Sequence, residues 1–295
     1  MRIEACEAAG WARNRIREVT GPAHSVHSRS PFIHRLQTWP RGHRGAFETL
    51  NYLLDGQNHA REGTVEHCCE QFALNCAIAE QHHNKLRAQA QLILNTFERR
   101  PKPRILLLAC GSCRDLQRIA ADLIGHENEG ELFLNDTDGN ALLAAKEALR
   151  LLIDLCRFIP GHPARAIRKL ESRGPFDLVT EGGLFDYLPD EQISYFVRNI
   201  YQRLLKPGGK LFFTNVGTGN PYRSWMEYLA DWVLIERSED DLFRLCRNAG
   251  VEEGLVRCHR DETGLTILAE VTRAAEGAAP SLSRRESAGA SRRCS

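Results

Sequence analysis

The sequence predicts an α/β fold with a doubly wound, mostly parallel sheet and an N-terminal helical region. Three observations support this prediction. Short apolar segments alternate with amphipathic segments from residue 104 to residue 216, which is typical of parallel strands joined by crossover helices. Two further strand-like segments surround the turn at 261–264, as in an antiparallel hairpin. Residues 65–97 carry apolar side chains at alternating spacings of four and three, which predicts helix.

The expected elements follow one another without long gaps. Strands are expected at 104–110 (RILLLAC), 130–136 (GELFLND), 156–161 (CRFIPG), 176–182 (FDLVTEG) and 210–216 (KLFFTNV), and the hairpin at 254–273 brings the number of strands to seven. Helices are expected at 114–125, 140–152 and 190–205. In such a sheet, ligands bind at the carboxyl ends of the strands.

The 295 residues are expected to divide into four parts. Residues 1–45 lack periodicity and are predicted to be poorly organised. Residues 46–98 form a helical cap, and residues 99–272 form the α/β domain. Residues 273–295 contain mostly Ala, Ser, Gly and Arg, so we expect them to be disordered.

Charge and cysteine content limit the possible partners. Arg outnumbers Glu by eight to three in residues 1–45 and by five to two in residues 273–295, so basic ends flank an acidic centre. Such ends can touch nucleic acid or an anionic membrane surface. Solvated ends explain the same pattern, and we expect no nucleic-acid partner. Without an apolar leader or a membrane-length apolar run, a cytoplasmic location is expected. Ten cysteines in a chain of this size do not indicate a disulfide framework.

The turn Ala109-Cys110-Gly111-Ser112-Cys113 follows the first strand and allows three interpretations. A Cys-x-x-Cys at a helix start suits a redox site, which needs thiols of lowered pKa. The Trp usually found before such a Cys is missing. A zinc site could use Cys69 and its neighbours, but consecutive ligands diverge around a helix, and no metal site is expected. A small-residue turn that admits a nucleotide-type cofactor is the preferred interpretation.

An acid at the end of the second strand supports the cofactor interpretation. Asp136 lies 25 residues after Gly111, where a carboxylate can accept hydrogen bonds from a ribose diol. Asp138 is expected to cap the next helix instead. The candidate cofactor-binding residues are Ala109, Cys110, Gly111, Asp136, Thr137, His162 and Glu181.

Six segments carry a family resemblance. ACGSCRDL, LNDTDGNAL, FDLVTEGGLFDYLPD and LKPGGKLFF together resemble the class I S-adenosylmethionine-dependent methyltransferases, over about residues 100–272. PRGHRGAFETLNYLL at 40–54 and WMEYLADWVLIERSEDDL at 225–242 resemble the bacterial enzymes that make 3-hydroxypalmitic acid methyl ester, a quorum-sensing signal. The resemblance implies a Rossmann-like seven-stranded fold, S-adenosylmethionine as cofactor, and methylation of the carboxylate of a 3-hydroxy fatty acid.

The first motif departs from the family pattern. Leu107 stands where the family has an acid, and Ala109 and Cys113 replace the outer glycines, so that only Gly111 is unchanged. The ammonium group of the cofactor therefore needs another partner, either backbone carbonyls or Glu181.

The acceptor site is expected beyond the fourth and fifth strands. A carboxylate acceptor is ionised at neutral pH and needs no strong base. Tyr187 and Asn215 are predicted to orient it, Arg223 to pair with it, and Trp232 to line an acyl pocket with residues 46–98. Ordinary structural roles explain Tyr187, Asn215 and Trp232 equally well, and an ordinary surface role is the commoner case for an Arg such as Arg223. Transient contact with a membrane surface could supply such a substrate.

Three other functions fit the same residues. The acceptor could be a small-molecule hydroxyl or amine, which would need a base. The sulfonium could react within its own molecule instead of donating methyl. The degenerate first motif also fits a methyltransferase-like module that binds a partner without catalysis.

Overall fold

A seven-stranded sheet with helices on both faces forms the centre of the molecule in the computed structural model, which describes residues 2–125 and 129–275. The strand order is β3-β2-β1-β4-β5-β7-β6, and β7 runs in the direction opposite to the other six strands of this sheet. The strands are β1 (Arg104–Leu108), β2 (Glu131–Asp136), β3 (Cys156–Pro160), β4 (Phe176–Glu181), β5 (Leu205–Val216), β6 (Val256–Arg260) and β7 (Thr266–Thr272). The predicted doubly wound, mostly parallel sheet and its terminal hairpin are confirmed.

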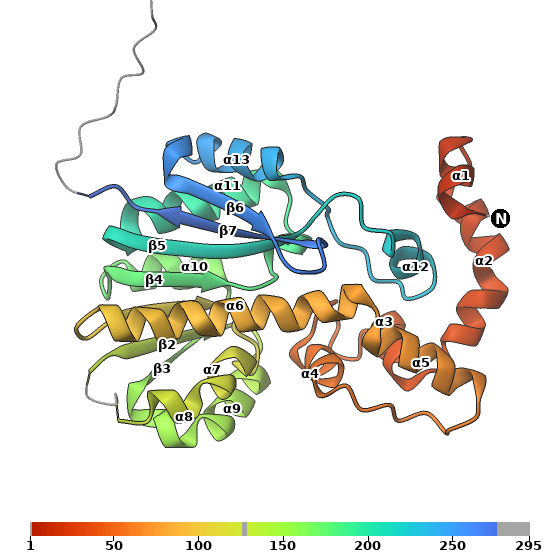
Figure 1. Cartoon of the computed structure of the whole chain (residues 1–295), viewed down its shortest axis with the longest axis horizontal. Coiled ribbons are helices and arrows are strands. Elements are labelled where there is room, and N and C mark those ends of the chain that lie inside the picture. The colour runs from red at the N-terminus through yellow and green to blue at the C-terminus, as the bar shows by residue number, and fades with distance from the viewer. Residues whose placement is uncertain (1, 126–128, 276–295) are drawn as a thin grey trace, which may run out of the picture.

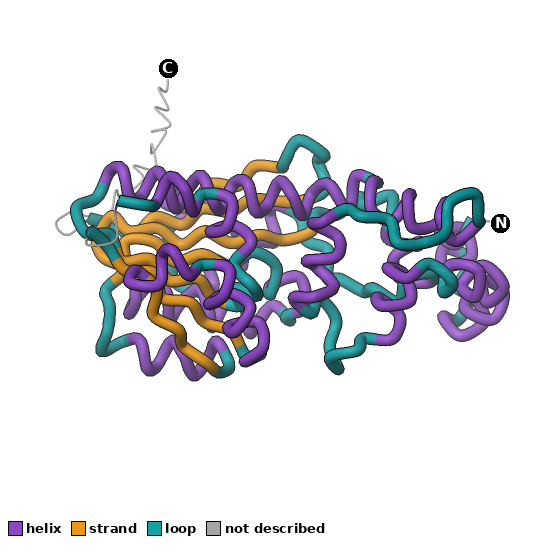
Figure 2. Tube along the Cα trace, turned by 90° about the horizontal axis from the view of Figure 1, so that it is seen from below, coloured by secondary structure: helices purple, strands orange, loops and turns teal. Residues whose placement is uncertain are grey.

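The central strands are apolar on both faces because helices cover both. In β1, Ile105 and Leu107 face one hydrophobic cluster, while Leu106 and Leu108 face the other. The first cluster packs under α6 (Ala77–Arg99), α7 (Arg114–Arg118), α8 (Ala120–Leu123) and α9 (Gly139–Ala148). The second packs under α10 (Pro163–Leu170), α11 (Asp190–Asn199) and α13 (Glu239–Asn248). Figure 2 shows the strands between these helical layers.

Helices also occupy the part that was expected to be poorly organised. Residues 1–45 contain α1 (Ile3–Ala8), α2 (Arg13–His27) and α3 (Pro31–Thr38), so that prediction is wrong. Ile16 is fully buried, and Ser30 caps α3 by accepting a hydrogen bond from the Ile33 N–H. The Arg223 guanidinium pairs with Glu7 and holds α1 against α12 (Arg223–Tyr228). The many Arg and His residues hide the helical periodicity of this part.

The helical cap contains two helices where one apolar stripe was predicted. After α4 (Phe47–Asp55), the stripe at 65–97 divides into α5 (Val65–Asn75) and α6. Cys76 lies between them with ψ of 161°, outside the helical region. Val65 and Phe72 of α5 are exposed, so the predicted stripe is not buried along its whole length.

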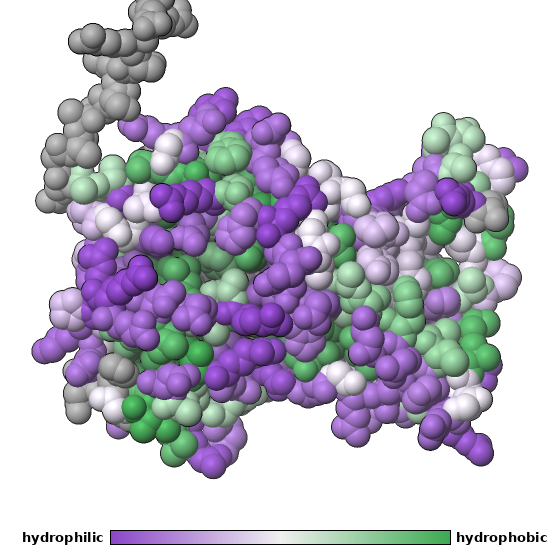
Figure 3. All heavy atoms as spheres, in the orientation of Figure 1, coloured by the Kyte–Doolittle hydropathy of each residue, from purple (hydrophilic) through white to green (hydrophobic). Residues whose placement is uncertain are grey.

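The N-terminal helices extend from one end of the sheet. Figure 1 shows α1 to α5 beyond the edge where β4 and β5 end, with α6 running from these helices along the sheet. Figure 3 shows mainly hydrophilic residues over the sheet domain and more hydrophobic residues over the N-terminal helices. No described helix is both long enough and apolar enough to cross a membrane. The predicted disordered tail lies outside the described residues from residue 276 onward.

Candidate functional site

A cavity of about 640 Å³ lies at the carboxyl ends of β1, β2, β3 and β4, where the fold predicts a ligand. The chain segments after these strands form its base, and residues 41–54 with α6 cover it. Its volume is within the range of about 300–1,000 Å³ that holds small-molecule ligands. From the predicted cofactor set, the wall includes Ala109, Cys110, Gly111, Asp136, Thr137 and His162.

The turn after β1 brings backbone close to the cavity. Ala109, Gly111 and Cys113 all have positive φ, at 49°, 54° and 57°. A left-handed conformation costs a non-glycine residue about 1–2 kcal/mol. Ala109 and Cys113 therefore adopt a backbone conformation that their residue types disfavour. The Gly111 N–H donates to Asp136 Oδ2 at 2.8 Å, which joins the turn to the end of β2.

The two cysteines of this turn lack the chemistry of a redox pair. A hydrogen bond with Cys110, together with burial, raises the pKa of the Cys113 thiol well above its usual value. The hydrogen bond from Cys113 lowers the pKa of Cys110, but burial and nearby carboxylates outweigh it and leave that pKa raised. Catalytic thiols need the opposite shift. The environment therefore favours the cofactor turn over the redox interpretation.

Asp136 is a partly buried carboxylate that keeps capacity to accept hydrogen bonds. Its Oδ2 accepts from the Gly111 N–H, and its Oδ1 accepts from the Asp138 N–H at 2.8 Å. Among the described residues, no Lys or Arg side chain pairs with it. Removal from water raises its pKa. Each oxygen retains a second lone pair, so the carboxylate can still accept from two hydroxyl groups.

A second carboxylate ties the N-terminal segment to this edge. Arg41 donates to both oxygens of Asp138, at 2.6 and 2.8 Å, and these hydrogen bonds lower the pKa of Asp138. Asp138 also caps α9 as predicted, because its Oδ1 accepts from the Asn140 N–H. The sequence did not reveal Arg41, which lies 97 residues from its partner.

The Glu181 side chain does not line the cavity but lies behind the residues that do. Its Oε1 accepts from the N–H groups of Gly183 and Leu184, so the carboxyl shapes the loop after β4 that does line the cavity. Burial raises its pKa to about 7. The other oxygen, Oε2, is buried without a hydrogen-bond partner among the described residues. Glu181 does not line the cavity, so its contact with the cofactor stays a prediction, and its hydrogen bonds show a role in ordering this loop.

Tyr187 lines the cavity, and two rings pack behind it; its role in orienting an acceptor stays a prediction. Its OH accepts from Trp232 Nε1 at 2.8 Å, and Trp232 stacks on His82 with 5.4 Å between ring centroids. His82 itself lines the cavity, whereas Trp232 is buried behind it and does not. Trp232 was predicted to line an acyl pocket, and the structure instead makes it a support for Tyr187.

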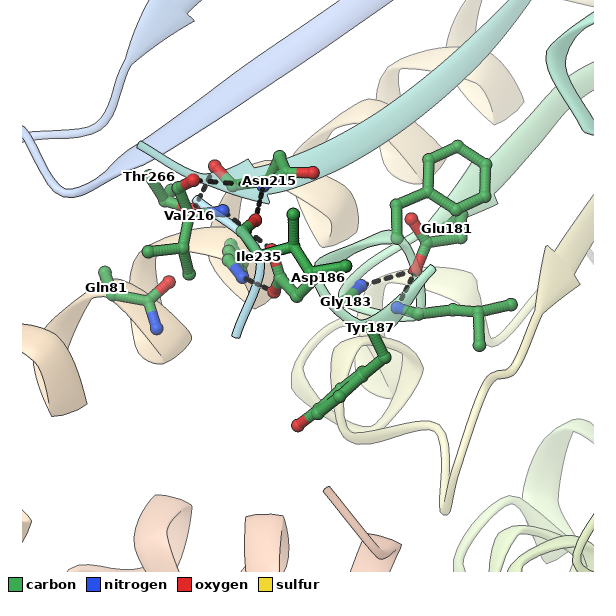
Figure 4. A network of polar contacts seen from close by, with 12 residues as sticks. Gln81, Glu181, Gly183, Asp186, Tyr187, Asn215, Val216, Ile235 and Thr266 are labelled. Carbon is green, nitrogen blue, oxygen red and sulfur yellow. Dashed lines mark hydrogen bonds and ion pairs between the residues drawn. The ribbon is translucent and has the colours of Figure 1, made fainter. Parts of the chain in front are cut away.

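Asn215 and Arg223 also lie away from the cavity. The Asn215 amide donates to the carbonyls of Val216 and Ile235 and accepts from Arg237. Figure 4 shows this network between Asn215 and Asp186, with the phenol of Tyr187 pointing away from it. Arg223 pairs with Glu7 at the far side of α12. Neither side chain is placed to orient or pair with an acceptor, which corrects both predictions.

Some of the Lys and Arg side chains that line the cavity form ion pairs with carboxylates, and Arg44 does not. Lys85 Nζ lies 2.8 Å from Asp186 Oδ2, and both side chains are buried. Arg41 and Arg114 are also paired with carboxylates. Arg44 stacks on Trp39, with 4.3 Å from guanidinium carbon to ring centre, and pairs with no described carboxylate. The sequence alone did not indicate Arg44, although it falls within the segment 40–54.

Comparison with known proteins shows which domains this part of the chain resembles. Residues 106–211 match the family model described as a methyltransferase domain. This part of the chain is similar to methyltransferase domains. Methyltransferase domains of this kind use S-adenosylmethionine as cofactor. The observed strand order, with its antiparallel β7, is the one expected of the methyltransferase domain. No curated protein matches the chain.

Solved structures show the same fold at low identity. A possible exported protein from Bordetella parapertussis is 20% identical, with a TM-score of 0.59 over 78% of this chain and 80% of its own. The S-adenosylmethionine-dependent methyltransferase SibL in its apo form is 15% identical, with a TM-score of 0.51 over 84% and 69%. Magnesium protoporphyrin IX methyltransferase from Synechocystis PCC 6803, with bound S-adenosylhomocysteine, is 10% identical, with a TM-score of 0.51 over 77% and 95%.

Proposed function

We propose that this methyltransferase transfers the methyl group of S-adenosylmethionine to the carboxylate of an acyl acceptor, and that the acceptor is a 3-hydroxy fatty acid. The observation that carries the carboxylate assignment is Arg44, a guanidinium on the cavity wall that no described carboxylate neutralises. The resemblance of residues 40–54 and 225–242 to the enzymes that make 3-hydroxypalmitic acid methyl ester supports the choice of fatty acid.

The residues after β1, β2 and β3 suit the nucleoside half of the cofactor. Asp136 would accept from the ribose diol, since it lines the cavity and its hydrogen bonds within the described chain come only from backbone N–H groups. Thr137 and His162 line the same end of the cavity. The backbone from Ala109 to Gly111 would approach the sulfur-bearing chain, where a side chain larger than these would intrude.

Methyl transfer to a carboxylate requires the protein mainly to position the two reactants. S-Adenosylmethionine, when bound, supplies a methyl group on a positively charged sulfur and is left as S-adenosylhomocysteine. A carboxylic acid with a pKa of about 4–5 is already ionised at neutral pH, so its oxygen attacks without a proton transfer. The protein needs to align that oxygen and exclude water, and such placement can supply roughly 7–11 kcal/mol at best.

Arg44 is positioned to hold the acceptor carboxylate. Its Nε is buried without a partner, so part of its donor capacity is unused. The neighbouring Gly45 packs against Tyr187: a Cβ at Gly45 would lie 2.5 Å from the phenol oxygen. Arg44 and Tyr187 thus line the same region, and together they would offer the acceptor a cation and a hydroxyl.

One face of α4 supplies an apolar wall for the acyl chain. Phe47, Leu50 and Leu54 follow one another at spacings of three and four and all line the cavity. Leu86 of α6 adds to this wall. The Ser112 hydroxyl donates to Asn51 Oδ1 at 2.8 Å, which fixes α4 over the cofactor turn.

Chain length should therefore control activity. Lengthening a 3-hydroxy fatty acid from about eight to about sixteen carbons should raise kcat/KM by orders of magnitude until the cavity is full, since each buried methylene contributes about 0.8 kcal/mol at most. The rates of methyl ester formation by purified enzyme would be measured by mass spectrometry. Leu54→Trp should shorten the preferred chain, while Leu143→Trp, at an exposed position on α9, should not. A flat profile would contradict the long-chain assignment.

A hydroxyl or amine acceptor is the second candidate, and His82 favours it. His82 lines the cavity, its Nε2 is buried without a partner, and burial lowers its pKa well below the usual value. A neutral imidazole of this kind can take a proton from an acceptor. A pH–rate profile that rises with a single ionisation, lost in His82→Gln, would favour this candidate.

A further inference from the structure

We infer that Asp115 and Gln89 form the binding site for the ammonium group of S-adenosylmethionine, in place of the acid that is missing at Leu107. The inference rests on the cofactor of the methyltransferase domain and is independent of the acceptor proposed above. Both residues line the cavity next to the turn after β1.

Asp115 is a buried carboxylate that forms no ion pair with a described residue. It is 2% exposed, its Oδ1 accepts from the Leu116 N–H, and its Oδ2 accepts from Gln89 Nε2 at 2.7 Å. No Lys, Arg or His side chain in the described ranges pairs with it. Burial raises its pKa to about 6, as expected for a carboxylate that lacks a positive partner. A bound ammonium group would supply that partner.

Gln89 adds a second acceptor, whose oxygen has no hydrogen-bond partner among the described residues. Its Nε2 donates to Asp115 and to Thr180 Oγ1, while its Oε1 is buried without a hydrogen bond. Gln89 is 5% exposed, so the missing partner is costly unless a ligand supplies it. The site depends on Gly182, because a Cβ there would lie 2.6 Å from Gln89 Oε1.

The position of the pair explains how the chain tolerates Leu107. Leu107 faces the cluster formed with Cys113 and Leu116, on the face of the sheet that α6 and α7 cover. Gln89 belongs to α6 and Asp115 to α7, so both lie on that same face. An ammonium group has three N–H donors, and a carboxylate with an amide oxygen provides two of the acceptors it needs.

Alternatively, the hydrogen bond between Gln89 and Asp115 could serve only to hold α6 against α7. The two roles make different predictions for ligands that differ in the ammonium group. S-Adenosylhomocysteine carries that group, whereas 5′-methylthioadenosine has the same nucleoside and lacks the amino-acid part. A fastening role would affect both ligands equally, and an ammonium site would affect only the first.

Calorimetry with these two ligands tests the inference. Asp115→Asn should weaken S-adenosylhomocysteine binding roughly ten- to a hundredfold, as expected for the loss of a hydrogen bond to a charged group, and leave 5′-methylthioadenosine binding unchanged. Asn keeps the size of the side chain, and its Oδ1 can still accept from Gln89 Nε2, so we expect the variant to fold. Gln89→Met should show the same selectivity with a smaller loss. Asp122→Asn, an exposed acid on α8, is the matched control and should bind both ligands normally.

Two outcomes would overturn the ammonium site. Equal losses for both ligands would assign the pair a structural role, and unchanged binding of both in Asp115→Asn would remove it from the site. If Asp115→Asn does not fold, Gln89→Met decides between the same outcomes. If the wild-type protein binds neither ligand, both the ammonium site and the cofactor-dependent function fail. Normal ligand selectivity without methyl ester formation would overturn only the proposed acceptor.

Discussion

Gly111→Val should abolish measurable binding of S-adenosylhomocysteine, a loss of more than about a hundredfold in Kd. Gly111 has φ of 54°, and a Cβ there would lie 3.5 Å from Phe47 Cβ. A β-branched residue is strained in this conformation by about 1–3 kcal/mol, and its methyl groups would fill the space between the turn and α4. Calorimetry with purified protein would measure the loss.

Gly56 offers a control that separates the effect of backbone strain from the effect on ligand binding. Gly56, at the end of α4, has φ of 64° and does not line the cavity, and a Cβ at this position would meet no atom within 4 Å. Gly56→Val should lower the melting temperature by a similar amount and keep ligand affinity. If Gly111→Val binds ligand as well as Gly56→Val does, the turn after β1 does not approach the cofactor.

Arg44→Gln should lower kcat/KM for a 3-hydroxy fatty acid roughly ten- to a hundredfold, mainly through a higher KM. The substitution removes the charge that we propose to face the acceptor carboxylate, and a hydrogen bond to a charged group is worth about 1.5–3 kcal/mol. Affinity for S-adenosylhomocysteine should not change. Steady-state rates and calorimetry on the same preparation would separate these effects.

Arg114→Gln provides the comparison, because Arg114 lies on the same cavity wall but already pairs with Asp55. An exposed pair of this kind contributes little, so we expect a change of at most about fivefold. Arg44→Lys keeps the charge and should recover part of the activity. A parallel loss of cofactor affinity in Arg44→Gln would place Arg44 at the cofactor and remove the main support for a carboxylate acceptor.

The sheet could be predicted because its strands are buried on both faces. Continuous apolar runs such as RILLL and the alternation with helices identify a parallel core without any knowledge of distant contacts. The helices of residues 3–38 could not be predicted in this way. Their order depends on partners more than 180 residues away, such as Arg223 for Glu7 and Leu229 for Gln37.

The residues of the candidate site likewise fall into those that the sequence predicts and those that it does not. Asp136 was predictable because it ends a strand at the edge where ligands bind. Arg41, Arg44 and Gln89 reach the cavity only through the packing of the N-terminal helices on the sheet, which no local pattern encodes. Asp115 did carry a signal, an acid directly after the cofactor turn within a segment that buries Leu116, but a helix-start acid is common enough to be overlooked.

Asn215, Arg223 and Trp232 illustrate the opposite error. Asn215 ends β5 and the other two follow it, where an acceptor could be expected, and each is a residue type common in binding sites. Their donors are used within the protein, by Ile235, Glu7 and Tyr187 respectively. Residue type and order along the chain therefore place a side chain near a site without deciding whether it faces it.

The chemical form of the transferred methyl group tests the central proposal most directly. The purified protein would be incubated with methyl-labelled S-adenosylmethionine and 3-hydroxypalmitate, and the lipid product treated with mild alkali. A methyl ester releases its label as volatile methanol, and we predict that essentially all of the label behaves in this way. Label that is transferred to the acceptor and survives alkali would show an ether or amine product, and would contradict methylation of a carboxylate.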